Sequence, residues 1–145
     1  MPFSRERLSR KGFTLIELLI VMIILGLLAA LVGPRFFGQE KKARQKAAKS
    51  QIALFETALD TYRLDVGRYP TSEQGLEALV TKPAGVDNWD GPYLQKAVPK
   101  DPWGNAYTYQ SPSEFGDYAI QSYGADGRPG GEDIDQDIAS WKDIE

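Results

Sequence analysis

The residues best suited to chemistry are five carboxylates in one glycine-rich loop. They fall within residues 126–137 of the 145-residue sequence: Asp126, Glu132, Asp133, Asp135 and Asp137. Carboxylates this close repel one another unless they are protonated, spread into water or held by a cation. Oxygen donors alone favour a hard ion, and an irregular loop suits the flexible coordination of Ca²⁺ better than that of Mg²⁺. The alternative is a solvated acidic tail.

The loop is not an EF-hand, although Asp133, Asp135 and Asp137 have the spacing that opens one. Ile138 replaces the turn glycine that an EF-hand requires, and Ile144 stands where the bidentate glutamate is needed. A cation bound here must therefore be held by an irregular loop.

The composition argues against an enzyme and against a nucleic-acid partner. The chain has no histidine and no cysteine, which removes the commonest general base, the commonest transition-metal ligand, thiol chemistry and disulfide bonds. A glycosidase could still use carboxylates, but it needs two of them in a substrate cleft, and this chain is small for one. With 17 basic and 20 acidic residues the net charge is −3, so the charge does not indicate nucleic acid as a partner. We expect no catalytic residues.

The longest apolar run, Phe13 to Val32, predicts a membrane-spanning helix. At about 1.5 Å per residue such a helix spans roughly 30 Å, the thickness of the hydrocarbon core of a bilayer. A secretory signal peptide is the alternative. It fits poorly, because its apolar part is about 7–15 residues long and because no small-x-small cleavage site follows this run.

One carboxylate, Glu17, lies inside the apolar run and needs a partner or the membrane interface. The residues before it, Arg10-Lys11-Gly12-Phe13, have the pattern of a processing site. Cleavage after Gly12 would create a positive amine on Phe13, which is unfavourable at a helix N-terminus. Glu17 of the same or a neighbouring subunit could neutralise that amine. The alternative is that Glu17 reaches the lipid headgroups.

The helical pattern continues beyond the membrane run to about Leu64. Gly33-Pro34 predicts a kink or local unwinding, and the basic residues of 41–49 predict a solvated or headgroup-facing surface. An apolar stripe at helical spacing predicts a face that covers a sheet; its members are Ala48, Ile52, Phe55, Leu59, Tyr62 and Val66.

The remaining elements are short. A capping box at Thr71 and Gln74 opens a predicted helix over 72–80 that buries Leu76, Leu79 and Val80. Alternating residues predict strands at about 106–110 and 118–123. We expect the three tryptophans, Trp89, Trp103 and Trp141, to be packing residues in the core or at a sheet edge.

The N-terminal motif RKGFTLIELLIVMIILGLLAALV resembles the type IV pilin-like, or class III, signal sequence that prepilin peptidase cleaves. The resemblance implies that residues 1–12 are a leader and that Gly12 is its last residue. It implies that Phe13 is the first mature residue and is N-methylated. It also implies that Glu17 is the acidic residue required for methylation and assembly.

Most of the chain is similar to the major pseudopilin of type II secretion systems. The motifs that carry the similarity are GRYPT at 67–71, QGL at 74–76, DPWGN at 101–105, GADG at 124–127, and Asp137-Ile138 before Trp141. Members of this family bind Ca²⁺ in the last loop. The resemblance implies ligands from the carboxylates of Asp126, Asp135 and Asp137 and the backbone carbonyls of Tyr123 and Arg128, with Asp133 or Gly131 as a further candidate.

The resulting prediction is an α+β, type IV pilin-like fold. A long N-terminal helix, apolar in its first half, packs on a small antiparallel sheet that carries a calcium-binding loop. The predicted parts are a leader over 1–12, a transmembrane and filament-core helix over 13–33, and a head over 34–145 with the acidic loop at 124–138.

The resemblance also implies a function and its partners. The subunit would cross the inner membrane once, with its head in the periplasm, and assemble with copies of itself into a pseudopilus that drives exoprotein export. Its partners would be prepilin peptidase, minor pseudopilins, the inner-membrane assembly platform and membrane lipid, with no nucleic acid. The alternatives are a type IV pilin, a minor pseudopilin, or a membrane-tethered calcium-binding module.

Overall fold

The computed structural model describes residues 12–142. Residues 1–11 of the predicted leader therefore lie outside the described part of the chain. The chain divides into two compact units, one ending at Gln39 and the other beginning at Glu40, and each is described by itself.

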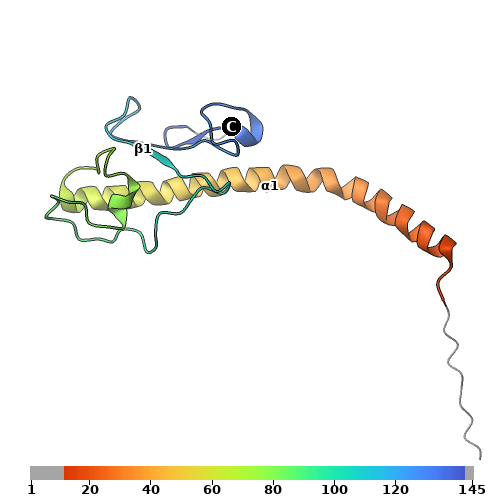
Figure 1. The fold of residues 1–145 in the computed structure, drawn as a ribbon. Coiled ribbons are helices and arrows are strands. Elements are labelled where there is room, and N and C mark those ends of the chain that lie inside the picture. Colours follow the sequence, from red (N-terminus) through yellow and green to blue (C-terminus); the bar gives the residue numbers. More distant parts are fainter. Residues whose placement is uncertain (1–11, 143–145) are drawn as a thin grey trace, which may run out of the picture. The chain divides into compact units, whose positions relative to one another are not determined.

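Helix α1 spans Leu15–Val66, 52 residues, and belongs to both units (Figure 1). The predicted long helix is thus confirmed to within two residues at each end. In the first unit every side chain from Phe13 to Val32 is exposed. Helical backbone continues through Gly33-Pro34, so the chain does not unwind there as one of the two expectations had it. A proline removes one backbone hydrogen bond, and the apolar and alanine-rich turns on either side keep theirs.

The second unit contains a three-stranded antiparallel sheet in the order β1-β2-β3. The strands are β1, Thr108–Gln110; β2, Ala119–Ser122; and β3, Ile138–Ala139. β1 pairs with β2 through Tyr109 opposite Ile120, and β2 pairs with β3 through Ser122 opposite Ile138. The first two strands were predicted, with slightly wider bounds. β3 was not, since a two-residue strand inside an acidic loop has no period to detect.

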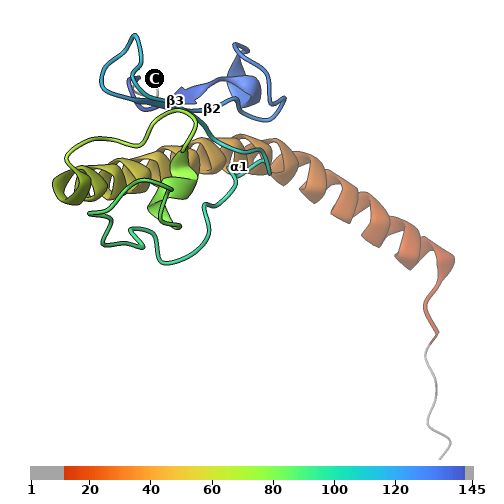
Figure 2. The ribbon, with the colours of Figure 1, turned by 60° about the vertical axis from the view of Figure 1, so that its left-hand side comes forward.

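The sheet lies over the second half of α1, as both views of the ribbon show (Figure 2). The predicted stripe faces it and is fully buried at Ala48, Ile52, Phe55, Leu59 and Tyr62. Ile120 of β2 and Ile138 of β3 belong to the same buried cluster. The ring of Phe55 meets that of Tyr107 edge-on, with centroids 5.1 Å apart. The helix period of the sequence therefore identified one side of the core correctly.

The prediction of a helix over 72–80 is wrong in its length and type. The capping box forms, because the backbone N–H of Thr71 donates to the Gln74 side chain at 3.0 Å and the N–H of Gln74 donates to Thr71 Oγ1 at 3.3 Å. The box closes only a turn, however, and the helix that follows is a single 3₁₀ turn, η1, Leu76–Leu79. Gly75 separates the two, with φ 62° and ψ −168°, a conformation outside any helix. η1 still buries Leu76 and Leu79 as predicted.

The tryptophans pack as expected. Trp89 and Trp103 are partly buried against the core, and the indole N–H of Trp89 donates to the Ala78 carbonyl at 2.8 Å. Trp141 stacks on Phe115 with ring centroids 4.1 Å apart. The interpretation of these residues as packing residues is confirmed.

Candidate assembly and cation-binding sites

The N-terminal end of α1 carries a reciprocal capping arrangement. The backbone N–H and the hydroxyl of Thr14 donate to Glu17 Oε2 at 2.9 and 3.1 Å. The backbone N–H of Glu17 donates to Thr14 Oγ1 at 3.2 Å. Two N–H groups of the helix start are thereby satisfied. The partner of Glu17 within the chain is therefore Thr14. The T-x-x-E spacing of a capping box signals this role in the sequence, although it was not among the roles predicted for Glu17.

The helix behind this cap is apolar on all sides. Among residues 12–142 it is the one helix that, by length and composition, could cross a membrane. Phe13 is 87% exposed and Leu15 88% exposed, and the large apolar side chains that follow are exposed as well. This surface is suited to lipid or to other apolar helices.

Two glycines shape the acidic loop of the second unit. A Cβ on Gly124 would lie 2.9 Å from the Ile134 carbonyl oxygen, and one on Gly131 would lie 2.5 Å from the Asp135 carbonyl oxygen. Both have positive φ, 69° and 92°. The N–H of Ala125 donates to the Ile134 carbonyl at 3.0 Å. The two arms of the loop therefore pass so closely that neither position accepts a side chain.

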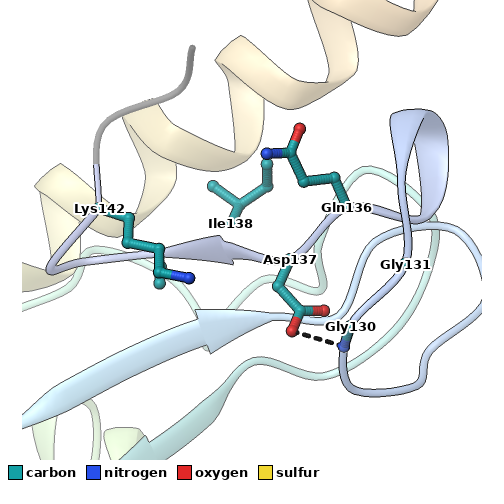
Figure 3. Close-up of a pocket in the computed structure, with 7 residues that line it drawn as sticks. Gly130, Gly131, Gln136, Asp137, Ile138 and Lys142 are labelled. Carbon is teal, nitrogen blue, oxygen red and sulfur yellow. Dashed lines mark hydrogen bonds between the residues drawn. The ribbon is translucent and has the colours of Figure 1, made fainter.

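Asp137 is the best-placed of the predicted ligands. Its Oδ2 accepts hydrogen bonds from the Gly130 backbone N–H at 2.8 Å and from Gln121 Nε2 at 2.9 Å. Figure 3 shows the carboxylate pointing toward Gly130 at the edge of a small cavity, whose lining also includes Lys142. The other oxygen, Oδ1, is buried and has no hydrogen-bond partner. A buried carboxylate oxygen without a partner is costly, and a cation would satisfy it.

The other predicted ligands are not gathered around it. Asp126 Oδ1 accepts a hydrogen bond from the Arg128 backbone N–H at 3.0 Å. Asp135 lies in a second 3₁₀ turn, η2, Asp133–Asp135, and the Asp133 carboxylate pairs with the Lys41 ammonium. In the part of the chain that the structure describes, no three acidic side chains lie close enough together to hold an ion. The ligand set therefore stays a prediction.

The donors in the loop nevertheless fit a hard cation. All are oxygens, and the unpartnered Oδ1 of Asp137 is a vacant acceptor. Of the two residues whose carbonyls were predicted as ligands, Arg128 lies in the loop and Tyr123 immediately precedes it. Asp133 is the weakest candidate, because an ammonium group already neutralises it.

A buried carboxylate at Asp101, 4% exposed, supports the start of the loop. Its Oδ1 accepts from the backbone N–H groups of Trp103 at 3.1 Å and Asn105 at 2.8 Å. Its Oδ2 accepts from the Ser122 hydroxyl at 2.6 Å. The Asn105 side chain in turn donates to the Gly124 carbonyl at 3.1 Å. This supporting role was not predicted, although an aspartate before Pro-Trp-Gly-Asn is the signal of a side-chain-capped turn.

The basic run at 41–49 is only partly the solvated surface that was predicted. Lys42, Arg44 and Lys46 are exposed. Lys41 and Lys49 are partly buried and contact the acidic loop or the residues that follow it. The correction has a physical reason: these two lysines lie on the side of α1 that meets the loop, and a charge count does not reveal the side.

Comparison with known proteins identifies the family. Residues 35–141 match the family described as type II secretion system (T2SS), protein G. The chain belongs to this family. Residues 7–33 match the prokaryotic N-terminal methylation motif, which agrees with the predicted signal sequence.

Similar full-length proteins carry the same description. The chain is 46% identical over 139 residues to the type II secretion system core protein G of Pseudomonas aeruginosa, covering 94% of this chain and 98% of that protein. It is 49% identical over 136 residues to the core protein G of Vibrio cholerae, covering 92% of each chain.

A solved structure supports the fold. The crystal structure of the major pseudopilin from the type 2 secretion system of enterohaemorrhagic Escherichia coli matches with a TM-score of 0.62 and 43% identity, over 72% of this chain and 92% of that one. The predicted pilin-like fold and the resemblance to major pseudopilins are confirmed. The family consists of structural subunits, and the chain is a membrane-anchored protein with a soluble head.

Proposed function

We propose that this chain is the core structural subunit of the periplasmic pseudopilus of a type II secretion system. The observation that carries the proposal is the exposed apolar surface of α1 from Leu15 to Val32. A helix that is apolar on all sides is stable only in lipid or among like helices. Lipid of the inner membrane would cover it before assembly, and the helices of neighbouring copies would cover it afterwards.

The route to the fibre begins at the N-terminus. Prepilin peptidase would remove residues 1–12, and the new amine of Phe13 would be methylated. Glu17 stands four residues further on, held at the helix start by Thr14. Its carboxylate would pair with the amine of a neighbouring copy, which neutralises two charges and fixes the register of the subunits.

The head would lie in the periplasm on a single membrane pass. Minor pseudopilins and the inner-membrane assembly platform would start and drive addition of subunits. Extension of the fibre would push folded exoproteins toward the outer membrane. This activity is mechanical and requires no catalytic residue.

The acidic loop would bind Ca²⁺ through Asp126, Asp135 and Asp137 and the carbonyls of Tyr123 and Arg128. The unpartnered Oδ1 of Asp137 supports this assignment. The ion would neutralise the crowded carboxylates and stabilise the folded head by mass action. The chain has no disulfide that could do so instead.

The intact mass of membrane-extracted protein from cells with the rest of the system tests the pathway. The wild-type chain is expected to begin at Phe13 with one added methyl group. A Gly12→Ala chain is expected to keep its leader. A Glu17→Gln chain should be cut at the same bond but give no sheared fibres. An uncut wild-type chain, or cleavage near Gly33, contradicts the proposal.

A further inference from the structure

Three polar residues of α1 face the acidic loop or the residues that follow it, at successive helical turns. They are Lys41, Gln45 and Lys49, each four residues after the last, so they share one side of the helix. Gln45 is 7% exposed, and both lysines are partly buried. All lie in the unit that begins at Glu40, as does the loop. A row of partly buried polar side chains on a helix is unusual unless each has a partner.

Two of these residues bind backbone carbonyls rather than carboxylates. Gln45 Nε2 donates to the Asp133 carbonyl at 2.7 Å. Lys49 Nζ donates to the Ala139 carbonyl at 2.8 Å and to the Lys142 carbonyl. The accepting carbonyls stand on both sides of the segment that contains Asp135 and Asp137. The segment is therefore fastened to α1 at its beginning and at its end.

The choice of carbonyls has a consequence for charge. An ammonium group paired with Asp137 would compete with a cation for that carboxylate, whereas one paired with the Ala139 carbonyl leaves Oδ1 of Asp137 available. Lys41 acts differently, because it pairs with the Asp133 carboxylate. Lys41 therefore reduces the repulsion between Asp133 and the other carboxylates of the loop, and Asp133 is not one of the proposed ligands.

We propose that Gln45 and Lys49 are positioning residues for the cation loop. By fastening the segment between Asp133 and Lys142, they preorganise Asp135 and Asp137 before the ion arrives. Ordering a loop costs conformational entropy, and a loop already ordered loses less of the binding free energy. The inference rests on the proposed calcium site, and it adds two residues that are neither ligands nor part of the loop.

The test uses the full-length chain in detergent micelles. Lys49→Met and Gln45→Met remove the donors and keep most of the side-chain volume, and Lys49→Arg restores donors. Lys46→Met is the matched control, since Lys46 is an exposed lysine on the same helix. Calorimetric titration with CaCl₂ measures affinity. Hydrogen exchange of residues 133–142 in excess chelator measures the order of the segment without the ion.

We expect Lys49→Met and Gln45→Met to weaken Ca²⁺ binding by about tenfold or more, the effect of losing a hydrogen bond or charge-assisted contact that holds the site. The Ca²⁺ affinity of Lys49→Arg should be within about threefold of the wild-type affinity. The affinity of the control, Lys46→Met, should equal that of wild type. In chelator the two Met variants should exchange faster at 133–142 while exchange in the rest of the head stays unchanged, which a general loss of folding would not permit.

The outcomes separate the two proposals. A wild-type chain that gives no heat with CaCl₂ overturns the calcium site, and with it the positioning role toward a cation. Normal wild-type binding with unchanged affinity in both Met variants overturns the positioning role alone. Unchanged exchange in chelator does the same, because the segment would then be ordered without these contacts. Since Lys49 is partly solvent-exposed, its Met and Arg variants decide the matter if Gln45→Met does not fold.

Discussion

The two halves of α1 have the same secondary structure and opposite relations to the rest of the chain. From Leu15 to Val32 the helix exposes its apolar side chains. From Ala48 to Tyr62 the same helix buries one stripe completely under the sheet. One half presents an exposed apolar surface, and the other forms part of the core of a domain.

Charge follows the same division. Between Leu15 and Val32 the single charged residue is Glu17, capped by Thr14. The second half carries basic residues, of which Lys41 and Lys49 reach the C-terminal segment. Both halves form a helix although their side chains have different surroundings, so helix formation does not distinguish them. Its behaviour is decided by what each face of the helix has to contact.

The largest effect should come from shortening a side chain of the buried stripe. Leu59 is fully buried, so Leu59→Ala should lower the free energy of unfolding of the head by about 2–5 kcal/mol through lost burial and a residual cavity. Leu25→Ala, in the exposed half, should change it by less than about 0.5 kcal/mol. Urea unfolding followed by tryptophan fluorescence measures both, because all three tryptophans belong to the unit that begins at Glu40.

Leu25→Ala is the control for Leu59→Ala, since it makes the same change in the exposed half of α1 and leaves that helix long enough to span a membrane. Equal losses of stability in the two variants would contradict the division of α1 into two independent halves.

Calcium removal should have a somewhat smaller effect, confined to the head. At a free concentration one hundred times the dissociation constant, an ion that binds only the folded state contributes about 2.7 kcal/mol. Excess chelator should therefore lower the unfolding temperature of the wild-type chain by on the order of 10 °C. The Asp137→Asn substitution removes the carboxylate whose Oδ1 has no hydrogen-bond partner. This variant should therefore unfold at the same temperature as the chelated wild-type chain, with or without the ion.

The same experiment sharpens the comparison between the two halves. Leu25→Ala should respond to chelator as wild type does. A chelator effect equal in wild type and Asp137→Asn would show that the ion acts elsewhere.

The smallest effect concerns tyrosine ionisation in the head. Burial raises the pKa of Tyr109 from 10.0 to about 12, and its hydroxyl donates to the Pro70 carbonyl at 2.8 Å. The folded state therefore keeps a proton that the unfolded state loses near pH 10. This contribution to stability is complete below pH 10 and disappears as the pH rises through about 12.

We expect the urea concentration at the unfolding midpoint of the wild-type head to decrease as the pH rises from 10 to about 12. The decrease should be less steep in Tyr109→Phe. Burial also raises the pKa of Tyr107 and Tyr118, so part of the slope should remain in the variant. An unchanged slope would assign the alkaline sensitivity to groups other than Tyr109.

Periodic and local features were predictable from the sequence. The stripe on α1 follows from a 3.6-residue repeat, and the Thr71–Gln74 box follows from residue types three positions apart. The helix expected after that box was wrong at Gly75, whose positive φ ends the turn. β3 was missed because two residues carry no detectable alternation.

The candidate site was predictable in its composition and less so in its contacts. Five carboxylates in a loop indicate a cation, but they do not indicate that Lys49 and Gln45 hold the backbone around them. These contacts join residues 88 to 93 positions apart in the sequence. They depend on how the loop returns to the helix, and a charge run gives no information about that return.

The place of β3 in the chain has a consequence for biosynthesis. Ile138 is part of the core and pairs with Ser122, so the sheet closes only after the chain has been made as far as Ala139. Until then β2 has an open edge and the core lacks a side chain, which are features that proteases and chaperones recognise. A chain truncated before Ile138 would keep the apolar half of α1 but would not close the sheet. Completion of the sheet in the head therefore depends on the last strand of the described chain.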